Sequence, residues 1–242
     1  MTPPPISRSW KWGEAGRGVT LLPLSQLSAS LLPALADLHA ATMPTLLADL
    51  GQPVVLRYYQ FAQKDPSVIA LCAVSESDHS ISPSAQKSPF TIHHSSLIGY
   101  ALGSPNPSAI NAQLRQPLAW FSAQMLRLVF TRPTALWQLA QSVLSASDEN
   151  NLAPGQLELT YIGVAPAARR QGLGKTLLTA FVDAARSAGY KSVVLSVETD
   201  NPAAIALYTK FGFTITKTFS EGRYHRHRME IPLIANRKSK IP

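Results

Sequence analysis

A run of alternating strand and helix patterns over residues 156–219 constrains the fold of this chain more than any other feature. Three segments rich in β-formers, "QLELTYIGV", "YKSVVLSVET" and "FTITKTF", predict strands. Between them, "KTLLTAFVDAARSAG" and "NPAAIALYTKFG" carry apolar residues at helical spacing. Leu173, Leu177 and Phe181 share one face of the first helix, and Gly189 is well placed to end it. Strands that alternate with helices predict an α/β core.

The residues before this run predict a second group of elements. Residues 18–24, "GVTLLPL", favour a strand, which is followed by a helix in "SQLSASLLPALADLHAAT" and a short helix in "MPTLLADLG". Residues 67–74 and 95–103 are short, rich in β-formers and bounded by turn residues, so we expect neighbouring antiparallel strands. The segment 75–94 between them is rich in Ser, Pro and His, which predicts a long loop. Its two adjacent histidines have no partners at metal-ligand spacing, and we expect no metal.

Residues 107–146 are a Leu-, Trp- and Gln-rich segment that separates the third predicted strand from the fourth. The spacing of its apolar residues predicts two helices, broken at Arg132 and Pro133. Its aromatic side chains fit an ordinary packed face, the wall of a substrate pocket or the contact surface of a homodimer. The sequence leaves these uses open.

Length and composition indicate a folded chain of 242 residues, 45% of them hydrophobic, which is enough to bury a substantial core. We expect a loose leader at 1–17, where three consecutive prolines oppose regular structure, then one domain at 18–235 and a basic tail at 236–242. The first residues contain no apolar signal core, and charges and a proline interrupt the longest apolar region. We therefore expect no membrane span and a cytoplasmic location.

The net charge of +8 permits several kinds of partner, because a positive field attracts anions without selecting one. Much of the excess lies in "RYHRHR" (223–228) and "NRKSK" (236–240), which we interpret as solvated basic segments. Nucleic acid is therefore not the partner that we expect. The single cysteine, Cys72, lies in the apolar run "SVIALCAV" and is interpreted as a buried hydrophobic residue.

The stretch "RRQGLGKT" at residues 169–176 ends in the letters of a nucleotide P-loop, but it does not fit that motif. A P-loop needs a glycine five places before the glycine of GKT, because its backbone amides wrap a phosphate. Arg169 occupies that place. The expected arrangement is instead a strand, a short basic loop with Gly172 and Gly174, and a long helix.

Such a loop can bind an anion through its backbone. The free N–H groups of a helix's first turn and a dipole of roughly +0.5 charge favour phosphate. Glycine at 172 and 174 keeps β-carbons from standing between the amides and the phosphate oxygens. We expect the amides to dominate and the side chains of Arg169, Arg170 and Lys175 to assist.

Two segments carry a family resemblance. "VAPAARRQGLGKTLL" resembles the acyl-coenzyme A pyrophosphate loop of the GNAT superfamily of N-acetyltransferases, whose pattern Arg169, Gly172 and Gly174 fill. "ETDNPAAIALYTKFGF" resembles that family's second signature, here Asn201, Leu207, Tyr208, Gly212 and Phe213. The resemblance is specific over residues 157–219 and consistent in element order over 18–103, whereas 107–146 departs from it.

The resemblance implies a GNAT-like fold of the α/β class (α+β type). This fold has a mixed, mostly antiparallel central sheet flanked by helices, here with the helical insertion between the third and fourth strands. It also implies acetyl-CoA as cosubstrate. The residues that it assigns to this cosubstrate are Ile162, Gly163, Val164, Arg169, Arg170, Gln171, Gly172, Leu173, Gly174, Lys175, Thr176, Asn201 and Tyr208.

Two residues are candidates for the proton transfers of acetyl transfer. An amine attacks a thioester only when it is neutral, so a base is needed, directly or through water. Glu158 stands where some family members carry their catalytic glutamate; its alternative is a strand-edge side chain that faces solvent or pairs with a basic residue. Tyr208 resembles the tyrosine that protonates the leaving thiolate; its alternative is an aromatic core residue with its hydroxyl at the surface.

The resemblance implies an N-acetyltransferase whose acceptor is a primary amine on a small molecule or a peptide. Two alternatives remain: a protein lysine or N-terminal acetyltransferase, and a GNAT-fold module that binds acyl-CoA without turnover. The sequence identifies neither the amine nor the length of the acyl group nor the oligomeric state.

Overall fold

The computed structural model describes residues 8–11, 18–43, 45–75, 96–131, 152–221 and 224–233. Eight strands form one sheet in the order β1-β2-β3-β4-β5-β6-β8-β7. They are β1 (Arg8–Lys11), β2 (Gly18–Pro23), β3 (Ile69–Ser75), β4 (Ser96–Ser104), β5 (Gln156–Val164), β6 (Ser192–Glu198), β7 (Thr214–Glu221) and β8 (Tyr224–Pro232). Only β5 and β6 pair in parallel. The predicted mixed, mostly antiparallel sheet is confirmed.

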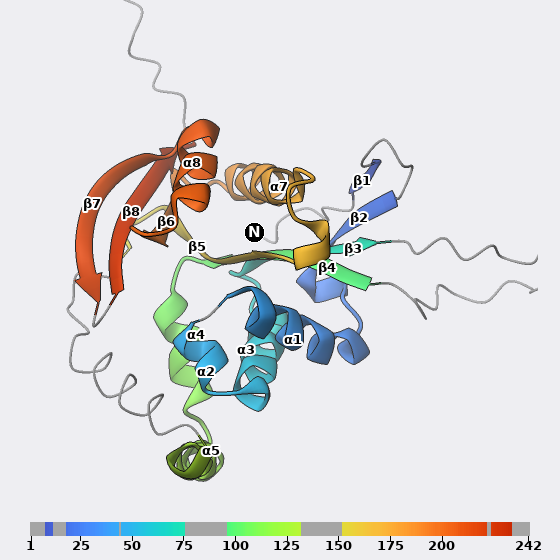
Figure 1. Ribbon diagram of the computed structural model, residues 1–242, viewed down its shortest axis with the longest axis vertical. Coiled ribbons are helices and arrows are strands. Elements are labelled where there is room, and N and C mark those ends of the chain that lie inside the picture. Colours follow the sequence, from blue (N-terminus) through green and yellow to red (C-terminus); the bar gives the residue numbers. More distant parts are fainter. Residues whose placement is uncertain are drawn as a thin grey trace, which may run out of the picture.

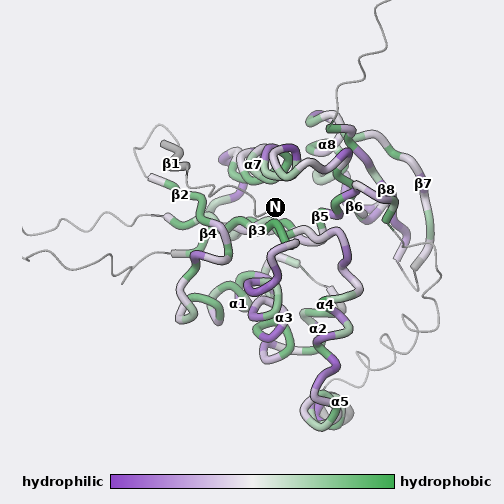
Figure 2. The backbone as a smooth tube through the Cα atoms, turned by 180° about the vertical axis from the view of Figure 1, so that it is seen from behind, coloured by the Kyte–Doolittle hydropathy of each residue, from purple (hydrophilic) through white to green (hydrophobic). Residues whose placement is uncertain are grey.

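Helices cover the sheet on both faces (Figure 1). One face carries α7 (Leu173–Ser187), which packs on β3, β4 and β5, and α8 (Pro202–Phe211). The other face carries α1 (Leu32–Thr42), with α3 (Gln52–Lys64) beside it. Further short elements are η1 (Leu24–Gln26), η2 (Ala29–Leu31), α2 (Leu46–Asp49) and η4 (Pro166–Ala168). In Figure 2 the hydrophobic stretches of β3 and β4 lie between these two layers.

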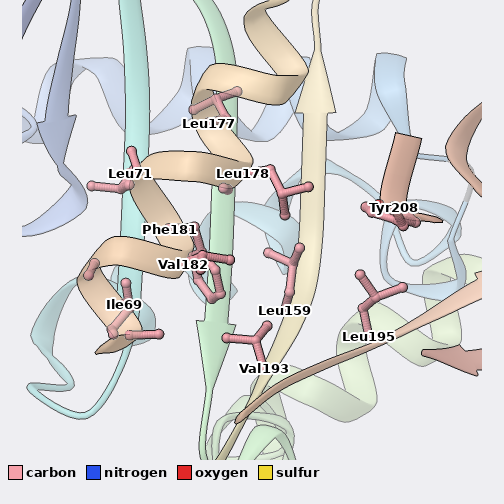
Figure 3. Packing of buried hydrophobic residues seen from close by; sticks show 14 of the residues in the cluster. Ile69, Leu71, Leu159, Leu177, Leu178, Phe181, Val182, Val193, Leu195 and Tyr208 are labelled. Carbon is pink, nitrogen blue, oxygen red and sulfur yellow. The ribbon is translucent and has the colours of Figure 1, made fainter. Parts of the chain in front are cut away.

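The helix α7 packs on the sheet through the face that its sequence predicts. Leu173, Leu177 and Phe181 are at most 1% exposed and belong to one hydrophobic cluster. Figure 3 shows Leu177 and Phe181 over side chains of β3, β5 and β6. Each such side chain contributes about 1.5 to 3 kcal/mol by leaving water. Gly103 of β4 allows the close approach, because a β-carbon there would collide with the Phe181 ring and the Glu158 carbonyl.

The helix α3 was not predicted from the sequence, although its signals are present. Gly51 with φ +96 precedes it, and Pro53 stands in its first turn. Buried side chains recur on one face at helical spacing: Val54, Val55, Tyr58, Tyr59 and Ala62. Together with α1 they form a second hydrophobic cluster against β3 and β4.

Two expectations about strands need correction. Residues 8–11, expected in a loose leader, form β1, because its backbone groups pair with those of β2, whose edge would otherwise be open. "RYHRHR", expected to be a solvated segment, lies largely in β8, which fills the place between β6 and β7. The missed signal is the apolar "MEIP" that follows it; Met229 is fully buried.

The insertion breaks earlier than expected. Its first helix is divided into α4 (Pro107–Leu114) and α5 (Leu118–Thr131), because Pro117 has no N–H for a helical hydrogen bond. The helix expected after Pro133, the loop 75–94 and the tail 236–242 lie outside the described residues, apart from Ser75. None of the helices within the described ranges is long and apolar enough to cross a membrane.

Candidate active site

β5 and β6 lie side by side over only part of their length. They pair over Gln156–Leu159, opposite Ser192–Leu195. Beyond this stretch β6 continues to Glu198 beside β8, whereas β5 continues to Val164 beside β4. The two strands therefore part, and Figure 1 shows β6, β8 and β7 turning away from β5. The gap in strand pairing starts directly after Leu159.

The second half of β5 presents backbone groups along this gap. Ala165 donates its N–H to a carbonyl of β4 at 2.8 Å. In an antiparallel ladder alternate residues point their polar groups to the same side, so those of Gly163 face β4, while those of Ile162 and Val164 face the gap. The Val164 carbonyl accepts from Arg169 Nε at 3.1 Å, in agreement with this placement. An extended ligand could pair with this edge as an added strand.

The loop from β5 to α7 ends in two residues with positive φ, Arg170 at 60° and Gly172 at 83°. Gly172 directly precedes α7, and none of the described side chains caps that helix end. The first N–H groups of a helix have no partner within it, so they remain available to an anion. The structure therefore contains the predicted strand, turn and uncapped helix.

The cationic side chains of the loop are exposed. Within the described part of the chain, no carboxylate forms an ion pair with Arg169, Arg170 or Lys175. Gln171 folds back and donates to the Ala167 carbonyl at 2.9 Å. The loop is thus tied to its own backbone and leaves its positive charges to the solvent.

The remaining loop residues divide between core and surface. Leu173 is 1% exposed, so its side chain belongs to the core. Thr176 Oγ1 donates to the Gly172 carbonyl at 3.4 Å. A β-carbon at Gly174 would meet only Leu207 at 3.7 Å and Val164 at 3.9 Å, which are ordinary contacts. The space next to the Gly174 α-carbon is therefore open enough for a side-chain atom.

The helix α8 stands on the other side of the gap and carries the second signature. Asn201 caps it, since its side-chain oxygen accepts from the Ala204 N–H at 3.1 Å. Tyr208 is 7% exposed and packs on Phe213, with ring centroids 5.8 Å apart. Burial raises the pKa of Tyr208 to about 12. Figure 3 shows Tyr208 on the side of β5 away from β3 and β4.

Glu158 lies on β5 just before the strands part. Its Oε1 accepts from Arg228 Nη1 at 2.8 Å, and the same nitrogen donates to Ser196 Oγ at 3.0 Å. Both partners of the ion pair are largely buried, with 18% of each side chain exposed. The glutamate therefore pairs with a basic residue, as the alternative foresaw, and Arg228 of β8 is a site residue that the sequence analysis missed.

Glu158 and Tyr208 approach the gap from opposite faces of the sheet. Leu157 and Leu159 lie in the cluster beneath α7, so Glu158 between them points to the face of α1 and α3. Tyr208 belongs to the cluster beneath α7. A group held in the gap would have the carboxylate on one side and the phenol on the other.

The face covered by α1 and α3, to which Glu158 points, contains a buried polar network that the sequence analysis missed. His39 is fully buried, and its Nδ1 lies 2.8 Å from Tyr59 Oη and 3.3 Å from Tyr100 Oη. Its Nε2 lies 3.2 Å from Thr45 Oγ1. Burial lowers the pKa of His39 to about 4, so it is neutral at pH 7.

Gly163 lets this network reach the sheet. A β-carbon at Gly163 would stand 2.5 Å from Thr42 Oγ1 of α1 and 2.5 Å from the Tyr100 ring. Its backbone polar groups are used by β4, as described above. The absence of a side chain at this position is therefore needed for packing.

The fold and the site define a protein with an open strand edge next to the uncapped start of a helix. The chain belongs to the acetyltransferase (GNAT) family, whose model matches residues 57–213. The predicted family resemblance is confirmed, and the match extends well beyond the two signatures.

Curated relatives share short segments with this chain. The mycothiol acetyltransferase of Renibacterium salmoninarum is 34% identical over 94 residues, which are 39% of this chain and 27% of that protein. The mycothiol acetyltransferase of Geodermatophilus obscurus is 33% identical over 107 residues, 44% of this chain and 34% of that protein. The matches thus span about a third or less of these relatives.

Solved structures share the fold over most of this chain. The ribosomal-protein-S18-alanine N-acetyltransferase of Escherichia coli has a TM-score of 0.50 and 16% identity, covering 92% of this chain and 99% of that one. The yncA protein of Salmonella typhimurium, solved with its cofactor acetyl-CoA, has a TM-score of 0.51 and 18% identity, covering 93% and 97%. At such identities the likeness concerns the fold.

Proposed function

We propose that this chain is an N-acetyltransferase that moves an acetyl group from acetyl-CoA to a primary amine by direct attack. The observation that carries the proposal is the parting of β5 from β6 beside the uncapped start of α7. A strand edge and a helix end at one place suit a ligand that has an extended arm and a diphosphate.

The residues that hold the cosubstrate follow from this arrangement. The amides at the start of α7 bind the diphosphate, with Arg170 and Lys175 nearby in solvent. The backbone groups of Ile162 and Val164 pair with the pantetheine arm. Asn201, whose side-chain oxygen is used as a helix cap, keeps its amide N–H groups for the same arm.

The chemistry divides between the two faces of the sheet. Glu158 accepts the proton that the amine loses, on the face of α1 and α3. Tyr208, on the face of α7, donates a proton or a hydrogen bond to the leaving thiolate. Arg228 fixes the Glu158 side chain through Oε1 and leaves Oε2 for this exchange.

The acceptor is a primary amine, and the choice between a small molecule and a protein is open to test. The purified chain is given acetyl-CoA and a panel of amines, and release of free thiol is measured. The panel contains a mycothiol-related amine, an amino sugar, a polyamine, an amino-acid derivative and peptides with a free N-terminus or lysine. Amine-dependent thiol release supports the proposal and identifies the acceptor class.

The same experiment separates the enzyme from a module that only binds acyl-CoA. Calorimetric titration with coenzyme A is done in parallel. Tight binding without thiol release for any amine would favour the binding module. The absence of binding would reject both.

A further inference from the structure

The face of the sheet that carries Glu158 is lined by buried hydroxyl groups. Tyr59 and Tyr100 each place their hydroxyl within 3.3 Å of His39 Nδ1. Tyr100 also lies 3.4 Å from Thr42 Oγ1, and Thr42 donates to the Leu38 carbonyl at 2.7 Å. These groups satisfy one another and join α1 and α3 to β4.

Tyr58 is the exception within this group. It is 1% exposed, and its hydroxyl has no hydrogen-bond partner among the described residues. The neighbouring Tyr59, on the same helix and equally buried, has one. Buried hydroxyls are nearly always paired, so this hydroxyl is suited to bind a water molecule or a polar ligand group.

The orphan hydroxyl belongs to a side chain that packs against β5. The Tyr58 ring meets the Tyr161 ring edge-on, with centroids 5.6 Å apart. Tyr161 is three residues after Glu158 on the same strand, and a bulge of β5 between them brings both to the face of α1 and α3. The pKa of Tyr58 is raised well above its usual value, mainly by burial. Coulombic interactions with Tyr161, Glu158 and Tyr100 raise it further, in that order, so the Glu158 charge acts on this hydroxyl.

The Glu158 carboxylate accepts a hydrogen bond from Arg228 through Oε1. A carboxylate has a second oxygen, here Oε2, that can accept a further hydrogen bond. The unpaired Tyr58 hydroxyl and the Glu158 carboxylate therefore lie on one face of the sheet, next to the place where β5 and β6 part. A water molecule that bridges the two would satisfy both.

We propose that Tyr58 is a positioning residue for the acetyl transfer. Its hydroxyl and Glu158 Oε2 together hold the water that takes the proton from the attacking amine. The inference rests on the proposed function. The amine nitrogen bonds to the thioester carbonyl carbon and gives its proton to this water, which passes a proton to Glu158. The carbon–sulfur bond breaks, and the thiolate takes a proton from Tyr208.

The variant Tyr58→Phe tests this role, because it keeps the ring and removes only the hydroxyl. We expect kcat to fall about fivefold or more, with the KM for acetyl-CoA and the melting temperature near the wild-type values. We also expect the acid limb of the pH profile of kcat to move to higher pH, because the water is then hydrogen-bonded to the carboxylate alone and no longer to the Tyr58 hydroxyl. The titratable groups around Tyr58 are Tyr59 on its own helix, Glu158 and Tyr161 on β5, and Tyr100 on β4.

The matched control is Tyr59→Phe, one residue away on the same helix. Its hydroxyl is paired with His39, so this variant should lose thermal stability and keep the wild-type pH profile. A wild-type kcat and pH profile for Tyr58→Phe would overturn the inference. Equal shifts of the profile in both variants would overturn it as well, because they would indicate a general effect of packing.

A crystal structure of the chain with coenzyme A provides a readout that is independent of turnover. We expect a water within hydrogen-bond distance of both Tyr58 Oη and Glu158 Oε2, and its loss in Tyr58→Phe. If the water is present but no amine releases thiol, the proposed function is wrong while the water site stands. If thiol is released but no water bridges the two oxygens, the inference alone is wrong.

Discussion

At the scale of single residues, burial determines the protonation state of Tyr208. Asn201 starts α8, and the helix carries Tyr208 against Phe213 beneath α7, with only 7% of the residue exposed. Because burial raises its pKa to about 12, the phenol keeps its proton throughout the neutral range. It can therefore donate to a thiolate in every molecule of the enzyme at pH 7.

We predict that Tyr208→Phe lowers turnover about tenfold or more, because the leaving thiolate loses its donor while the packed ring stays. Steady-state thiol release measures kcat, and calorimetry measures coenzyme A binding, which should stay near the wild-type value. The variant Tyr224→Phe, on β8, is a control for loss of a tyrosine hydroxyl elsewhere. Unchanged turnover in Tyr208→Phe would remove this residue from the mechanism.

At the scale of elements, the start of α7 combines a free helix end with a constrained turn. Arg170 and Gly172 adopt positive φ angles, which cost free energy for the non-glycine residue. The turn leads directly into the uncapped start of α7, and a β-carbon at Gly174 would make only ordinary contacts. A side chain at position 174 can therefore extend from the helix start without displacing the protein.

We predict that Gly174→Trp abolishes coenzyme A binding and keeps the fold, because the indole would occupy the space in front of the amides. Calorimetric titration measures binding, and circular dichroism checks the fold. The matched control is Arg186→Trp in the last turn of the same helix, where the side chain is exposed. Tight binding by Gly174→Trp would refute the assignment of the loop.

At the scale of the whole molecule, the sheet separates two clusters of different character. The cluster under α7 and α8 is mainly hydrophobic, and Met229 of β8 is part of it. The cluster under α1 and α3 includes the buried polar network around His39. Burial favours the neutral form of that histidine, so we expect the stability of this layer to depend on pH.

We predict that acid destabilises the protein through His39. The pKa falls from 6.5 in the unfolded chain to about 4 in the folded one, so the unfolded chain binds more protons between these values. The contribution is fully present above pH 6.5 and is lost as the pH falls towards 4. The total loss is about 3 kcal/mol, from the shift and 1.36 kcal/mol per pH unit.

Urea denaturation at pH 7 and pH 4.5 measures this loss. The variant His39→Gln should be less stable than wild type at pH 7, because it loses hydrogen bonds, but should lose less stability in acid. The exposed His225 supplies the control variant His225→Gln. Parallel stability curves for wild type and His39→Gln would contradict the prediction.

Much of the fold could be predicted from local patterns. The spacing of Leu173, Leu177 and Phe181 predicted α7, and the glycines before it predicted its free end. The helix α3 was missed although Pro53 and its apolar spacing are ordinary signals. The strand β8, between β6 and β7, was missed because it carries arginines that a charge count assigns to solvent.

The alternation of strands and helices over residues 156–219, the family and the loop that suits a diphosphate were determined by the sequence alone, since helical spacing and glycine placement act over a few neighbouring residues. Only the tertiary structure decided which side chains meet at the site. The Glu158–Arg228 pair joins residues 70 positions apart. Tyr58, with its unpaired hydroxyl, comes a hundred positions before Glu158 in the sequence, yet both lie on the same face of the sheet. Such contacts depend on strand register and on how closely the helices approach the sheet, and these are set by packing across the whole domain.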